Sequence, residues 1–208
     1  MAKNTGSIRE IRKKVTSTHE CISTAYHEAG HAVFGLLSGV QVPSVCVFQN
    51  KKSKRWDGFT HYNSIDLTEV EDAALLSQLL DIEIGIKYAG LVAERYHFKR
   101  ISGSDKFPFY WKDGSSDDTK TAAELIKKYS TIPAGRKRYA YKQKIIRQDF
   151  AALQLYWDSV TLVAHALFHK KKLYFEDLKR ILTKKSEDKN FWKTQFKDIE
   201  NIFDSPRS

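Results

Sequence analysis

The residues with the clearest chemical meaning lie in the segment 24–33, which reads TAYHEAGHAV. It contains the pattern His-Glu-x-x-His, with His27 and His31 four positions apart. On an α-helix this spacing places both imidazoles on one face, where they can reach one metal ion at about 2.0–2.1 Å. Glu28 lies next to that face and is placed to take a proton from a zinc-bound water. The pattern therefore predicts a zinc peptidase site with Glu28 as general base.

The surroundings of the two histidines are apolar, as in a buried helix. The neighbouring apolar residues are Ala25, Ala29, Ala32, Val33, Leu36 and Leu37. Imidazoles and a carboxylate in such surroundings need a partner, because a buried polar group without one costs free energy. A metal ion provides that partner. Gly39 marks the expected end of this first core helix, which we predict to cover residues 19–38.

Length and composition predict one main domain. The chain has 208 residues, of which 41% are hydrophobic and 12% aromatic, and this is ample for a single core. We expect a basic N-terminal arm over residues 1–18, a domain over 19–183 and a C-terminal helical extension over 184–208. No apolar stretch approaches the roughly 20 residues that span a bilayer, and the N-terminus lacks the apolar core of a signal peptide. We therefore predict a soluble, cytoplasmic protein with no membrane span.

The chain has two cysteines, Cys21 and Cys46, which do not form a Cys-x-x-Cys motif. We expect both to be reduced, with Cys46 buried in a strand. The formal net charge is +10, and much of the positive charge lies in four clusters at residues 9–14, 51–55, 136–138 and 170–172. Such clusters can attract nucleic acid, an anionic membrane or an acidic protein. Because they are dispersed and no nucleic-acid motif accompanies them, solvated faces are favoured and the charge identifies no partner.

The remaining pattern predicts a mainly α fold with a small β-hairpin or sheet beside the HExxH helix. Residues 40–68 contain β-type side chains on both sides of a Lys-rich stretch, which is typical of a hairpin. Residues 99–117 contain turn formers and an aromatic segment at 107–111, and we expect a loop. Helical spacing of apolar residues, or flanking turn signals, predict five further helices. The first covers residues 68–98 and is long or broken, and the second runs from Asp117 or Asp118 to Tyr129. The others run from about 136 to 168, over 175–182 and over 190–203.

Several of these segments together resemble the peptidase domain of the FtsH family of zinc proteases. The matching segments are 25–33 (zinc signature), 45–60 (hairpin), 89–94 (a helix ending Ala-Glu), 114–122 (third-ligand segment) and 167–182 (closing helix pair). The resemblance spans about residues 19–182 and marks 19–183 as an FtsH-like zinc peptidase domain. It implies a mostly helical domain, here without the family's ATPase domain and membrane segments.

The resemblance also implies roles for two acidic residues. The aspartate that opens the helix after the small-residue run is the family's third zinc ligand, and this position is Asp118. If the alignment is shifted by one residue, the neighbouring Asp117 is the ligand instead. An aspartate at this position is also a good helix N-cap. Glu94 falls near the zinc site, where it would hydrogen-bond to His27 or His31, form a salt bridge, or act as the third ligand as in other zinc peptidases. Further rivals for the third ligand are His61, His97, His165 and His169.

These features predict an ATP-independent zinc endopeptidase that cleaves unfolded or flexible polypeptide, since the sequence has no phosphate-binding loop of the Gly-x-x-x-x-Gly-Lys type. The substrate would add a strand along the hairpin edge, near residues 45–48 or 59–62. Two alternatives stay open. One is a non-proteolytic zinc module that binds a protein or nucleic acid through its basic surface, and the other is a regulatory protease that cleaves a single partner. The oligomeric state also stays open.

Overall fold

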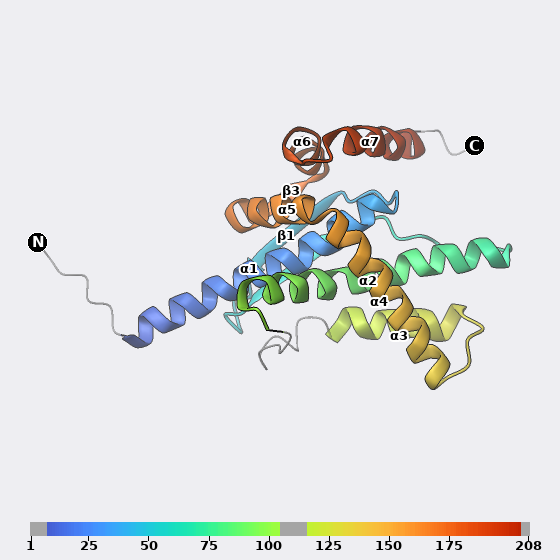
Figure 1. Cartoon of the computed structure of the whole chain (residues 1–208), viewed down its shortest axis with the longest axis horizontal. Helices are drawn as coiled ribbons and strands as arrows, with labels where there is room; N and C mark the ends of the chain where they lie inside the picture. The colour runs from blue at the N-terminus through green and yellow to red at the C-terminus, as the bar shows by residue number, and fades with distance from the viewer. Residues whose placement is uncertain (1–7, 105–115, 205–208) are drawn as a thin grey trace, which may run out of the picture.

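The computed structural model describes residues 8–104 and 116–204, which form helices around a three-stranded sheet (Figure 1). The elements, in chain order, are α1 (Ile8–Leu37), β1 (Ser44–Gln49), β2 (Trp56–His61), α2 (Ala73–Ser102), α3 (Ser116–Tyr129), α4 (Arg136–Leu155), α5 (Trp157–Lys170), β3 (Lys172–Tyr174), α6 (Phe175–Lys185) and α7 (Lys189–Asp204). The predicted mainly α fold with a small sheet is confirmed. The aromatic segment 107–111 lies outside the described residues.

Helix α1 is longer than the predicted 19–38, because it begins at Ile8. Residues 8–18 contain no Gly or Pro and several good helix formers, so nothing stops the helix from continuing toward the N-terminus. Its first turns project away from the other helices (Figure 1). At the other end, Gly39 adopts a positive φ of 77° and its N–H bonds to the Leu36 carbonyl at 3.1 Å. The glycine stop lies where the sequence predicted it.

The sheet has the order β2-β1-β3, and all pairs are antiparallel. The predicted hairpin is present as β1 and β2, with Val45 opposite Thr60. On its other side Val45 pairs with Leu173 of β3. This corrects one expectation: β1 is the central strand, so residues 45–48 do not offer a free edge to a substrate. Of the two segments expected to offer an edge, only the one in β2 does so, and in the described sheet β3 forms the opposite edge.

Cys46 is also corrected, because it lies in β1 as expected but is only half-buried. Side chains alternate between the two faces of a strand. In β1 Val45 and Val47 take the inward positions and are fully buried. Cys46 therefore points to the opposite face of the sheet.

Helix α2 is one continuous helix, and small residues allow it to pack closely on α1. Asp72 caps its start by accepting a hydrogen bond from the Leu75 N–H at 2.6 Å. A methyl group on Gly30 of α1 would stand 2.5 Å from the Ala89 carbonyl oxygen of α2. The two helix backbones are thus nearly in contact at the level of the HExxH motif.

The predicted single helix from about 136 to 168 is wrong, because the chain forms α4 and α5 with a break at Tyr156. No Gly or Pro marks this break. The Tyr156 ring instead packs on Phe191 and Trp192, with centroid distances of 5.0 and 5.8 Å. We attribute the break to this tertiary contact with α7. The last two predicted helices are confirmed as α6 and α7.

Two clusters of buried apolar side chains support these elements. The larger one joins α1, the sheet, α5, α6 and α7 and includes parts of α2 and α4, while the smaller one joins α2, α3 and α4. Over the described ranges, none of the helices combines the length and the apolar character that crossing a bilayer requires.

Candidate metal centre

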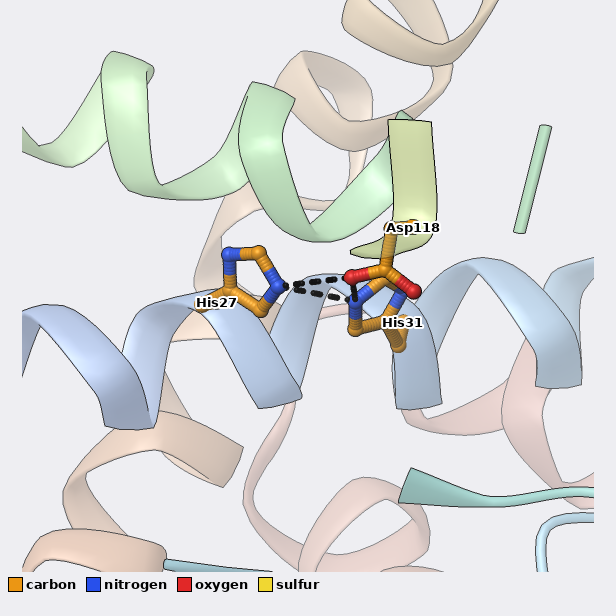
Figure 2. A group of neighbouring side chains, drawn as sticks. All are labelled: His27, His31 and Asp118. Atoms are coloured by element: carbon orange, nitrogen blue, oxygen red, sulfur yellow. Dashed lines mark hydrogen bonds and ion pairs between the residues drawn. The ribbon is translucent and has the colours of Figure 1, made fainter. Parts of the chain in front are cut away.

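His27 and His31 of α1 and Asp118 of α3 converge on one point (Figure 2). The two Nε2 atoms lie 3.0 Å apart, and the Asp118 Oδ2 atom lies 3.2 Å from each. Ligand atoms at about 2.0–2.1 Å from a tetrahedral zinc ion lie roughly 3.3 Å from one another. The three atoms therefore have the spacing of three zinc ligands with little rearrangement. Within the described part of the chain, this is the group of His, Cys, Asp and Glu side chains that could hold a metal ion.

The far nitrogen of each imidazole contacts an acceptor. The Nδ1 atom of His27 lies 3.3 Å from Glu94 Oε2, and that of His31 lies 2.6 Å from the Ile86 carbonyl oxygen. Acceptors at these positions favour the tautomer with the proton on Nδ1. The Nε2 lone pair of each ring is then directed at the metal position.

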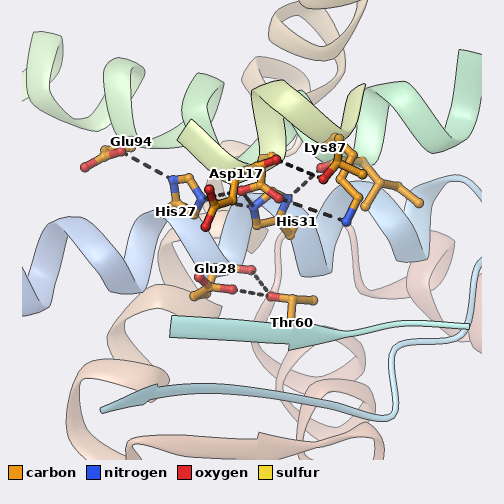
Figure 3. A network of polar contacts seen from close by, with 10 residues as sticks. His27, Glu28, His31, Thr60, Lys87, Glu94 and Asp117 are labelled. Carbon is orange, nitrogen blue, oxygen red and sulfur yellow. Dashed lines mark hydrogen bonds and ion pairs between the residues drawn. The ribbon is translucent and has the colours of Figure 1, made fainter. Parts of the chain in front are cut away.

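Glu94 is itself held in place, since the Ser23 hydroxyl donates a hydrogen bond to its Oε1 atom. Its carboxylate reaches His27 from the side away from His31 (Figure 3), at Nδ1, whereas Asp118 contacts Nε2. It is thus placed to orient His27, which is the supporting role that the sequence suggested. Its position does not bring it into the group of three ligand atoms.

The charges of this site depend on one another. Burial raises the pKa of Asp118, but its hydrogen bonds to His27 and His31 outweigh this and hold that pKa far below its usual value. Burial lowers the pKa of His27, yet the carboxylates of Asp118 and Glu94 more than reverse the effect and raise it well above its usual value. The metal-free site therefore favours a protonated His27. Metal binding would release that proton.

The structure distinguishes the two neighbouring aspartates at the start of α3. The Asp118 side chain is 24% exposed and faces the histidines, whereas the Asp117 side chain is 94% exposed. Asp117 lies 3.5 Å from the Lys120 ammonium, one turn along the helix. Of the two, Asp118 has the position of a metal ligand.

Glu28 is buried between α1 and the sheet (Figure 3). Its Oε2 atom accepts a hydrogen bond from the Thr60 hydroxyl at 2.7 Å. Gly58 of β2 makes room for it, because a methyl group there would stand 2.5 Å from Glu28 Oε1. The hairpin thus fixes the carboxylate that the motif places beside the metal position.

A cleft of about 90 Å³ connects these groups. Its lining residues are Glu28, His31, Gly58, Phe59, Thr60, Tyr62, Lys87 and Asp118. The proposed base, two of the three ligands and the edge strand β2 therefore border the same space. This arrangement allows a polypeptide on β2 to approach both the metal position and the base.

Lys87 is the residue of this cleft that sequence reasoning missed. Its ammonium lies 4.0 Å from Asp118 Oδ1 and 5.0 Å from the centre of the Tyr62 ring. The sequence held a signal, because Lys87 lies inside the otherwise uncharged, mostly apolar run 84–93. A cation in so apolar a stretch of helix indicates a partner such as Asp118.

The other histidines considered as third ligand lie away from this group. His61 is exposed on β2, with its ring centre 6.4 Å from that of Phe59. His97, His165 and His169 line a different pocket, which shares no lining residue with the cleft. None of these four belongs to the group that could hold the metal.

Comparison with known proteins found no family model and no curated protein that matches the chain. The resemblance to FtsH-type peptidase domains therefore stays a prediction from the sequence.

Proposed function

We propose that this protein is a zinc metalloendopeptidase that cleaves unfolded or flexible polypeptide. The observation that supports it is the single cleft bordered by Glu28 and by the ligand atoms of His31 and Asp118, with His27 completing the triangle. Structural zinc sites usually fill all four positions with protein ligands, whereas catalytic sites use three and keep one for water or substrate. Three ligands plus a neighbouring carboxylate match the catalytic kind.

A zinc ion held by His27, His31 and Asp118 would polarise the scissile carbonyl and lower the pKa of water to about 7. Glu28 would take the proton of the attacking water and deliver it to the leaving nitrogen. The hydrogen bond from Thr60 holds one oxygen of Glu28 and leaves the other for this transfer. Lys87 adds positive charge on the cleft side of Asp118, where negative charge develops in the transition state.

The substrate would bind along the outer edge of β2. This strand has an unpaired edge among the described strands, and an extended peptide can add to such an edge through backbone hydrogen bonds. Phe59, which is 59% exposed and lines the cleft, would contact a substrate side chain. Only unfolded segments or flexible loops can adopt this extended form.

Both cysteines are free, in keeping with a cytoplasmic location.

The test compares the parent with Glu28→Gln in casein cleavage, without added nucleotide. We expect the parent to bind zinc, to lose cleavage with a chelator and to regain it with zinc. The variant should keep the zinc but lose about 10²–10⁴-fold in rate, because glutamine has the shape of glutamate and cannot accept the proton. Equal rates for parent and variant would exclude Glu28 as the base. Zinc content below about 0.2 per chain, with no uptake on titration, would exclude the proposal for a site of normal affinity.

The same test separates the alternative of a zinc module that binds partners through its basic surface without cleaving them. Such a module needs no carboxylate beside the metal. Its partner binding would therefore be insensitive to Glu28→Gln, and the parent would show no zinc-dependent cleavage.

A further inference from the structure

A second pocket, of about 390 Å³, lies between α1, α2 and α5. It has no lining residue in common with the metal cleft. Its volume falls within the range of about 300–1,000 Å³ that small-molecule sites occupy. The metalloendopeptidase proposal gives it no role.

The inner wall of this pocket is apolar and firmly packed. Ala25, Tyr26 and Ala164 are almost completely buried there. The Tyr26 ring stacks on the His97 ring at a centroid distance of 3.6 Å, and it also stacks on Trp157 at 5.5 Å. A wall fixed by such contacts is formed before any ligand arrives, so binding costs little rearrangement.

The polar side chains of the pocket are mainly histidines, contributed by three helices. They are His19 of α1, His97 of α2, and His165 and His169 of α5. His165 and His169 are four positions apart, so they share one face of α5. The described lining residues include no Asp or Glu, and Ser23 adds a hydroxyl group. The described lining can therefore donate several hydrogen bonds to a ligand and includes no carboxylate of its own, while Glu94 lies behind Ser23.

The electrostatics of His97 point in the same direction. Burial, followed by positive charge on His165, lowers the pKa of His97 to about 4, although the Glu94 carboxylate acts in the opposite direction. Burial disfavours a charge of either sign, whereas the electrostatic effect of His165 disfavours a cation specifically. An anionic ligand is thus better suited to this pocket than a cationic one.

A metal ion is a poorer occupant. Metal ligands must bring their donor atoms close together, and in the described residues only His27, His31 and Asp118 do so. The histidines of this pocket are arranged around a larger space. They are suited to hydrogen bonds with an organic anion.

We propose that the pocket is a binding site for a small amphipathic carboxylate. Its apolar part would pack against Tyr26 and Phe168, and its carboxylate would accept hydrogen bonds from the surrounding imidazoles. Contacts between side chains also link the pocket to the metal centre. Ser23 lines the pocket and donates a hydrogen bond to Glu94, and Glu94 contacts His27. The ligand would therefore lie beside the hydrogen bonds that orient a metal ligand.

The experiment is calorimetric titration of the full chain with 4-phenylbutyrate, octanoate and indole-3-acetate. Each acid is paired with its uncharged amide. We expect saturable binding of at least one acid at one site per chain, at least about tenfold tighter than its amide. His165→Leu should weaken binding by about tenfold or more, since it removes an exposed hydrogen-bond donor of the pocket. His61→Leu changes a histidine that is also exposed but lies outside both pockets, and it should leave affinity unchanged.

Three results would overturn the proposal. The first is no saturable binding of any acid up to about 5 mM. The second is equal affinity for acids and amides. The third is binding that His165→Leu leaves unchanged, which is the result expected if the carboxylate coordinated zinc in the cleft. Because the readout is binding, none of these outcomes depends on whether the protein cleaves polypeptide.

Discussion

Gly90 of α2 lies so close to His27 of α1 that a methyl group on its Cα would stand 2.7 Å from the His27 Nε2 atom. The same methyl group would be in contact with the Nε2 atom of His31. These nitrogens are two of the three proposed metal ligands. Because Gly90 has no side chain, the Nε2 atoms of His27 and His31 have room to lie close together.

The first prediction is that Gly90→Ala loses zinc although no ligand is changed. Its Cβ would push both Nε2 atoms out of their positions. Helix α2 has little room to move away, because Ala89, Val92 and Ala93 pack in the same buried cluster as α1. Elemental analysis of purified variant should give less than about 0.2 zinc per chain. Gly35→Ala is the matched control, since its Cβ would contact only Val42, at 3.3 Å, and should keep the zinc. Parent-like zinc affinity in Gly90→Ala would show that the metal does not bind between these nitrogens.

The second prediction concerns the two neighbouring aspartates. Asp118→Ala should weaken zinc binding by more than the roughly 10–100-fold that a supporting residue is worth, because it removes an anionic ligand. Asp117→Ala removes the same charge from an exposed position and should leave the affinity near the parent value. Competition with a chromophoric chelator measures both. The opposite ranking would mean that Asp117 is the ligand, and unchanged affinity in both would exclude α3 from the site.

The third prediction is that Glu94→Gln weakens zinc binding by about 10–100-fold and leaves the fold intact. Glutamine can still accept a hydrogen bond from His27, but it lacks the negative charge that makes the imidazole a better ligand. The same chelator competition gives the value. An unchanged zinc affinity would mean that Glu94 contributes only to packing. A loss as large as that of Asp118→Ala would favour Glu94 as a direct ligand.

Much of the fold was predictable because its signals are local. The HExxH helix, the hairpin and helices α2, α6 and α7 each carry their own periodicity and turn residues. The three-residue strand β3 is too short for any periodicity, and it forms because β1 offers it a pairing partner. Likewise the break at Tyr156 depends on a contact with α7, which lies some 35 residues further along the chain. Such features require the tertiary structure.

The candidate site divides in the same way. His27, Glu28 and His31 form a contiguous pattern, so their chemistry could be predicted from spacing alone. Asp118 is 91 residues from His27, and only the family resemblance suggested that the two would meet. Lys87 was missed because it belongs to no motif, and its role depends on the position of Asp118. Contacts across such sequence distances depend on helix packing, which a single sequence does not reveal.

The last prediction concerns Asp149 of α4, whose side chain lies between helices and is 1% exposed. Its Oδ2 atom has no hydrogen-bond partner in the described structure. Burial, together with the negative charge of Asp81, raises the pKa of Asp149 to about 8. The folded protein therefore holds a proton on this group that the unfolded chain releases above about pH 4. Because the folded state binds more protons, this group makes stability fall as pH rises from about 4 to 8.

Asp149→Asn should remove this dependence, since asparagine has a similar shape and no charge to bury. Relative to the parent, the variant should gain stability with rising pH, by up to about 1.4 kcal/mol per pH unit in that range. Urea unfolding of both proteins at several values between about pH 5 and 8 measures the difference in their free energies of unfolding. Groups other than Asp149 titrate alike in both proteins, so their contributions cancel in this difference. Asp117→Asn, at an exposed position, should leave the pH dependence of the unfolding free energy as it is in the parent. A constant difference between parent and Asp149→Asn across this range would mean that Asp149 is ionised in the folded protein.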